Sequence, residues 1–165
     1  MAHIGINFDQ FLALEMKIVQ MRGLMDDLRP EWAEVAVELE RYFARTFEQE
    51  GPGWAQLAEA TVRERRRLGY GARHPILVRE GDLMRSYTSQ ASVQMEPHWF
   101  WYVSSSELAG YHQTGTKHMP ARPAVQLFRM LPIMQRSFED ALIKRVNQLW
   151  HERTGRGTFA GGMAA

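Results

Sequence analysis

Six histidines are the residues of this 165-residue chain that first suggest chemistry, namely a metal site. His112 and His118 lie on either side of a glycine, while His74 and His98 occur elsewhere in the chain. Zinc sites commonly pair histidines four residues apart on a helix, or combine histidines with cysteines. The chain has no such histidine pair and no cysteine. We therefore expect no metal site, and we interpret the histidines as surface or loop residues.

Serine and acidic side chains are the other groups that could catalyse a reaction. No Gly-x-Ser-x-Gly nucleophile motif is present, and Ser104–Ser106 follows a predicted strand, where serines usually bond backbone groups. The acid pairs Asp26–Asp27 and Glu139–Asp140 fall on predicted solvent faces, and no phosphate-binding glycine motif occurs. The sequence therefore predicts a protein that is not an enzyme, with no catalytic residues and no cofactor.

A cluster of arginines is a sharper signal. A short helix predicted from Ala58 to Leu68 carries Arg63, Arg65, Arg66 and Arg67. One interpretation is a nucleic-acid-binding module, in which these arginines contact phosphates and Tyr70 stacks on a base. The alternative is a solvated helix face, or an interface with acidic residues of another subunit. We favour the alternative, because the formal net charge of the whole chain is only +1.

The central element of the predicted fold is a β-hairpin. From Tyr87 to Met95, large or apolar residues alternate with polar residues, which is typical of a half-buried strand. Trp99–Val103 follows after a short break and consists of aromatic and branched residues that favour strands. Both faces of this second strand are apolar, so we expect both to be covered, either by helices or by another subunit. If helices cover one face only, the other face is expected to be a protein interface.

Helices should surround this hairpin and position it. A narrow apolar stripe near the N-terminus predicts a helix that lies along another helix. The residues of this stripe are Phe11, Leu14, Ile18, Met21, Met25 and Leu28. A second helix should run from Glu31 to Glu48, with Glu31 facing solvent. Ile76–Val78 resembles a short edge strand, and Pro132 is a suitable first residue for a last helix ending near Trp150.

These elements predict a single α+β domain over residues 1–150, in which a small antiparallel sheet packs against several helices. The N-terminal helices span 7–48, the sheet region 76–130 and the C-terminal helix 132–150, and a flexible glycine-rich tail follows over 151–165. We expect the core to include five residues, which come from the loop after the second helix, from a brief helix that should begin near Gly81, and from the hairpin. They are Trp54, Leu83, Trp99, Trp101 and Val103.

Composition sets limits on the class of protein. A hydrophobic content of 45% is normal for a globular domain, and the lack of cysteine excludes a disulfide framework. No apolar run approaches the roughly 20 residues that a membrane span needs, and no secretory signal is visible. We therefore expect a soluble protein that is made in the cytoplasm and does not enter a membrane.

The order of several motifs along the chain resembles the phage virion morphogenesis family, the tail-completion proteins of contractile-tailed phages such as Mu and P2. The similarity spans about Phe43 to Val146 and depends on four motifs in the right order. They are Phe47–Leu57 with Thr61 and a basic stretch, Ile76–Ser86, Tyr111–Gly115 and Pro120–Pro123.

The resemblance implies a structural, non-enzymatic virion protein at the head–tail neck. Such a protein completes or terminates the tail and joins it to the head. Related neck proteins form rings around the DNA channel, so the implied partners are further copies in a hexameric ring, other neck, tail-tube or connector proteins, and DNA in the channel. Both a tail terminator and a head-side adaptor fit this description.

The loop from Gln113 to Pro123 is the segment that we expect to reach a neighbouring subunit or the tail tube. Its candidate interface residues are His112, Gln113, Gly115, Arg122 and Pro123. Under this hypothesis, replacing Arg122 with alanine spares folding and impairs assembly. The arginines at 63–67 would then face an acidic partner or the channel DNA.

Overall fold

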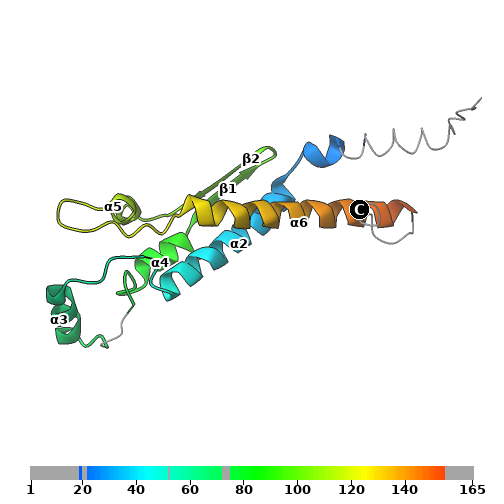
Figure 1. Cartoon of the computed structure of the whole chain (residues 1–165). Coiled ribbons are helices and arrows are strands. Elements are labelled where there is room, and N and C mark those ends of the chain that lie inside the picture. Colours follow the sequence, from blue (N-terminus) through cyan, green and yellow to red (C-terminus); the bar gives the residue numbers. More distant parts are fainter. Residues whose placement is uncertain (1–18, 20–21, 52, 72–74, 155–165) are drawn as a thin grey trace, which may run out of the picture.

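The protein is described here from a computed structural model that covers residues 19, 22–51, 53–71 and 75–154. The helices are α2 (Arg29–Glu48), α3 (Glu59–Arg67), α4 (Asp82–Tyr87), α5 (Leu108–Thr114) and α6 (Leu127–Thr154), and the strands are β1 (Ser92–Glu96) and β2 (Trp99–Val103). Residues 22–25 add a helical turn before α2. The predicted α+β class is confirmed: a two-stranded antiparallel sheet packs against helices (Figure 1).

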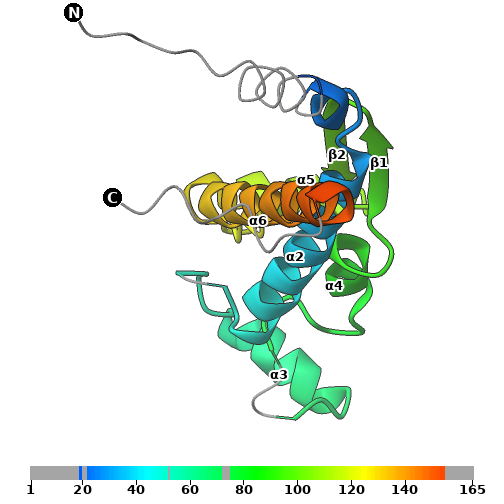
Figure 2. The same ribbon diagram turned by 90° about the vertical axis from the view of Figure 1, so that its right-hand side faces the viewer.

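Helix α2 forms the centre of the core. Val35, Leu39, Phe43 and Phe47 form an apolar stripe at helical spacing along it, and all four are buried. Helix α6 lies along α2, and the hairpin lies against the N-terminal part of α2 (Figures 1 and 2). Burial of this stripe against α6, α4 and the hairpin is the main favourable term for the fold.

The hairpin pairs Ser92 with Val103 and Glu96 with Trp99, so that one face turns inward and the other outward. On the inner face, Phe100 stacks on Trp32 at 5.8 Å between ring centroids, and Tyr102 stacks on Phe43 at 5.7 Å. The hydroxyl of Tyr102 also donates a hydrogen bond to the carbonyl of Tyr87, and burial raises the pKa of Tyr102 to about 12. The inner face therefore belongs to the core.

The outer face of the hairpin corrects part of the predicted core. Trp54 and Leu83 are buried as predicted, but Trp99, Trp101 and Val103 are 45%, 59% and 48% exposed. Helices cover one face of the hairpin only, and the side chains of these three residues alternate with the half-buried Phe100 and Tyr102. Within the described residues, helices therefore cover one face, and the alternative in which another subunit covers the second face stays a prediction.

Three predicted boundaries also change. The alternating run begins as helix, because Tyr87 ends α4 and enters the core from there. Residues 76–78 form a turn in which Leu77 has a φ of 61°, and Ile76 is buried without being in a strand. Helix α6 starts at Leu127, so Pro132 lies inside it, where its ring removes one backbone donor.

The two ends of the chain differ from prediction or lie outside the description. Most of the predicted N-terminal helix from residue 7 falls outside the described residues. At the other end, α6 continues to Thr154, so the first residues of the predicted tail are helical, and 155–165 lies outside the described part. No described helix has the length and apolarity that crossing a membrane requires.

Candidate assembly site

The motifs that are far apart in the sequence meet at one place in the structure. The Nε1 of Trp54 donates a hydrogen bond of 2.9 Å to the carbonyl of Pro123. The backbone N–H of Arg122 donates to the carbonyl of His112 at 2.8 Å. In addition, the backbone N–H of Ile76 donates to Oε1 of Glu50 at 3.2 Å. The loop after α5 is thereby joined to the segment that follows α2.

Arg122 is the most buried residue of the predicted interface set, with 6% of its surface exposed. Its Nε donates to the carbonyl of Ala55 at 2.8 Å, and its Nη2 donates to the carbonyl of Gln56 at 3.0 Å. Burial and the nearby charge of Arg65 lower the pKa of Arg122. The side chain therefore holds two segments of its own chain together, which corrects the expectation that it reaches a neighbour.

Gln113 and Gly115 fix the same loop. The side-chain amide of Gln113 donates a hydrogen bond of 2.7 Å to the carbonyl of Val125, and its oxygen accepts one of 3.1 Å from the backbone N–H of Val125. Gly115 has a φ of 78°, and a Cβ there would lie 2.8 Å from the backbone nitrogen of Ala121. Only glycine fits this close approach. The loop between α5 and α6 is therefore closed on itself by backbone contacts.

We expect Arg122→Ala to lower the free energy of unfolding by about 2 kcal/mol, because the carbonyls of Ala55 and Gln56 lose their buried donor. Urea unfolding followed by circular dichroism measures the change. Arg66→Ala, on the exposed surface of α3, is the matched control and should change stability by less than about 0.5 kcal/mol. Equal stability of Arg122→Ala and wild type would contradict the structural role.

His112 is half-buried beside this network. Its Nδ1 is buried and has no hydrogen-bond partner among the described residues. Burial lowers the pKa of His112 below its ordinary value of 6.5, and the charge of Arg122 lowers the pKa further. Protonation of His112 in the folded chain is therefore unfavourable.

This shift of the His112 pKa predicts a pH dependence. Below an ordinary histidine pKa of 6.5, the unfolded chain binds a proton that folded His112 resists. Stability is therefore lost as the pH falls through this range, and His112→Gln should lose less stability than wild type. Urea unfolding of both proteins at about pH 7.5 and about pH 5.5 tests the difference. Identical losses for the two proteins would contradict it.

The predicted arginine cluster lies on α3, which Figure 1 places beside the end of α2 and away from the hairpin. Helix α3 contains no buried residue. Arg67 pairs with Glu64 at 2.7 Å and Arg63 lies 3.6 Å from Glu59, while Arg65 donates to the carbonyl of Pro75. Acids of the same helix thus offset part of the positive charge.

The outer hairpin face, defined as Trp99, Trp101 and Val103, leaves two tryptophan side chains about half exposed. The two tryptophan rings meet edge to face, with centroids 6.1 Å apart. A second group of exposed apolar residues lies at the start of α6, where Leu127, Phe128 and Leu131 are 60%, 73% and 54% exposed. Apolar groups gathered in this way are typical of protein interfaces.

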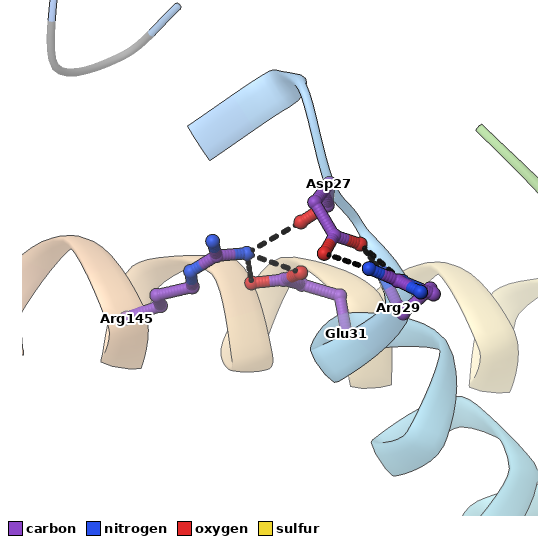
Figure 3. A network of polar contacts seen from close by, with 4 residues as sticks. All are labelled: Asp27, Arg29, Glu31 and Arg145. Atoms are coloured by element: carbon purple, nitrogen blue, oxygen red, sulfur yellow. Dashed lines mark hydrogen bonds and ion pairs between the residues drawn. The ribbon is translucent and has the colours of Figure 1, made fainter. Parts of the chain in front are cut away.

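A buried ion pair was missed by the sequence interpretation. Glu31, which we expected to face solvent, is 1% exposed, and its Oε2 lies 3.0 Å from Nη1 of Arg145 on α6. The same nitrogen donates to the carbonyl of Asp27 at 2.7 Å, as Figure 3 shows. Hydrogen bonds from Arg29 lower the pKa of Asp27 to about 2. Glu31, Val35 and Leu39 are spaced four residues apart, which places Glu31 on the buried face of the helix. This spacing could have revealed the burial of Glu31 from the sequence.

Among the described residues, no group of three or more histidine, cysteine, aspartate or glutamate side chains is arranged to hold a metal ion. A groove with a volume of about 710 Å³ lies between α2 and α6. Both acidic and basic residues line it, among them Glu34, Glu38, Arg136 and Lys144. This groove offers no excess of one charge that would select an ionic substrate.

Comparisons with protein-family models, with curated proteins and with solved structures found no match to this chain.

Proposed function

We propose that this chain is a structural, non-enzymatic virion protein of a phage, acting at the head–tail neck. In this proposal it is made in the host cytoplasm and becomes part of the virion. It completes or terminates the tail and joins it to the head, and it works as a ring of identical copies with a hexamer as the expected size. The observation that carries the proposal is the outer hairpin face, where Trp99, Trp101 and Val103 are about half exposed within a single chain.

Burial of this face in an assembly would supply the driving force for ring formation. Apolar surface removed from water contributes about 25 cal/mol per Å², and aromatic residues are enriched at protein interfaces. The exposed apolar residues at the start of α6 provide a further surface for other neck, tail-tube or connector proteins. A ring contact is heterologous, so each subunit must offer two different surfaces.

The order of the sequence motifs is the reason why we propose a role at the head–tail neck rather than another structural role. The motifs around Trp54, His112 and Arg122 resemble those of tail-completion proteins and also contact one another within this fold. Their role in the proposal is to hold the loop between α5 and α6 in one shape. A neighbouring protein would then contact the exposed residues of that loop, such as Lys117 and His118.

Electron microscopy of the purified chain tests this function. We expect ring-shaped particles with a central channel, either from the protein alone or after mixing with tail tubes. Particles that attach to the end of a tail tube would support the neck role. A protein that neither forms rings nor binds tail tubes, at concentrations where it stays folded, would overturn the proposal.

A nucleic-acid-binding module is the second candidate function, favoured by α3. This helix has no buried residue, and Arg63, Arg66 and Arg67 are exposed on it. In a DNA-binding module the affinity for duplex DNA falls steeply with salt, with a slope set by the number of phosphates contacted. Salt-dependent binding that Arg66→Ala and Arg63→Ala weaken would favour this function. Within the ring proposal, the same contact would be made with DNA in the channel.

A further inference from the structure

The outer hairpin face lacks a cover within the described part of its own chain, and the described structure indicates which segment could supply one. The strand β1 contributes Ser92, Gln94 and Glu96 to the same face, opposite Val103, Trp101 and Trp99. An occupant must therefore be apolar along one side and tolerate a polar, acidic margin. At five residues per strand, the face is about 17 Å long.

The chain before α2 is attached beside this hairpin. The backbone N–H of Leu28 donates to the carbonyl of Pro97 in the hairpin turn at 2.9 Å. The helical turn 22–25 then leads away from the body of the molecule, past the hairpin turn (Figures 1 and 2). Leu24 and Leu28 are buried, but Met25 and Val19 are 52% and 64% exposed. The segment that precedes α2 therefore has exposed apolar side chains where it extends away from the body of the molecule.

The sequence of residues 7–21 matches the requirements of the outer hairpin face. Its apolar residues recur at helical spacing in a narrow stripe, namely Phe11, Leu14, Ile18 and Met21. As a helix, this segment would extend over about 22 Å, enough to span the face. The segment carries Lys17, whose charge complements Glu96 on the margin of the hairpin, together with the acids Asp9 and Glu15.

We propose that residues 7–21 of one copy cover the outer hairpin face of a neighbouring copy. This inference rests on the proposed function, because it names the contact that would join copies in the ring. The neighbour's face is the target because the turn 22–25 leads away from the molecule's own hairpin. The contact is heterologous, since a segment meets a sheet face, and repeated contacts of this kind close into a ring or continue as a filament.

Disulfide trapping tests the contact directly, because the chain has no native cysteine. The full-length variants Ile18→Cys and Gln94→Cys are purified separately, mixed in equal amounts and oxidised. Gln94 is exposed and lies opposite Trp101, so a cysteine there probes the face without removing a tryptophan. We expect a disulfide between the two different chains. Replacing Gln94→Cys with Glu48→Cys, at the exposed end of α2, is the matched control and should yield little product.

A second variant keeps the inference testable if a cysteine variant folds poorly. In the full-length chain, Ile18→Asp places a charge within the apolar stripe, and we expect it to lower the mass of the assembly in light scattering at least twofold. In a chain that carries both Ile18→Cys and Gln94→Cys, a disulfide that forms only within single chains would overturn the inference, because the segment would then cover its own hairpin.

The outcomes separate the inference from the proposed function. If Ile18→Asp forms the same ring as wild type and no disulfide joins the mixed chains, the inference is wrong while ring formation stands. If the wild-type chain is a monomer that neither cross-links nor binds tail tubes, both the inference and the proposed function are wrong.

Discussion

Replacing Arg145 by methionine should lower the free energy of unfolding by about 3 kcal/mol, because it leaves the buried carboxylate of Glu31 without its cation. Methionine keeps most of the side-chain volume, so the loss reports the charge and the hydrogen bonds rather than a cavity. The carbonyl of Asp27 also loses its donor, which loosens the connection between the turn 22–25 and α6. Chemical unfolding in urea measures the change.

Lys144→Met is the matched control for this experiment. Lys144 is the neighbour of Arg145 and lies 3.6 Å from Glu34, but both side chains of that pair are more than half exposed. Exposed ion pairs contribute little, so the control should stay within about 0.5 kcal/mol of wild type. Adding Glu31→Met to Arg145→Met should recover much of the loss, because no buried charge then remains unpaired. Equal losses for Arg145→Met and Lys144→Met would contradict the buried ion pair.

Trp54→Ala should lower the free energy of unfolding by about 4 kcal/mol. Trp54 is buried, its ring meets that of Phe47 edge to face at 5.5 Å, and its Nε1 bonds to the carbonyl of Pro123. The substitution therefore opens a cavity beside α2 and releases the loop that Arg122 also holds. Thermal and urea unfolding should both show the loss.

Trp54→Phe separates the two contributions of Trp54. It keeps most of the ring contact with Phe47 and removes the hydrogen bond to Pro123. Loss of this hydrogen bond should lower the free energy of unfolding by about 1 kcal/mol, in addition to the effect of the smaller ring. A loss in Trp54→Phe as large as that in Trp54→Ala would mean that the hydrogen bond dominates. Near wild-type stability of Trp54→Ala would contradict the place of Trp54 in the core.

Much of the helical core could be predicted from the sequence. The apolar stripe of α2 combines spacings of three and four residues, and the spacing of three between Trp32 and Val35 places both on one side in a helix but not in a strand. Trp54 and Leu83 also lie in the core as predicted. The local sequence was sufficient here because the spacing of the apolar residues predicts which face of the helix is buried.

The covered face of the hairpin could not be predicted in the same way. Trp99–Val103 has large apolar side chains on both faces, so its composition does not distinguish Phe100, which is packed on Trp32, from the exposed Trp101. That distinction depends on which helices reach the sheet, a property of the tertiary structure. The alternating run from Tyr87 also placed the start of the strand too early, because Tyr87 ends α4 and β1 begins only at Ser92.

The candidate site was predicted as a set of residues but not in its contacts. His112 and Gln113 lie at the end of α5, Gly115, Arg122 and Pro123 lie in the loop that follows, and hydrogen bonds join this region to other parts of its own chain. An arginine in a polar loop is usually exposed, and only the carbonyls of Ala55 and Gln56, distant in sequence, explain the burial of Arg122. The role of Glu31 likewise depends on Arg145, which is far away in the sequence.

The most direct test of the account is the solution mass of the full-length chain, measured by light scattering over a concentration series beside the variant Trp101→Ser. The account predicts that the wild-type mass rises to a ring-sized multiple of the 19.1 kDa chain. Trp101→Ser, with a polar residue on the outer hairpin face, should remain a folded monomer at the same concentrations. If both proteins assemble to the same mass, or if both stay monomeric and neither assembles on added tail tubes, the claim that this face joins the subunits is contradicted.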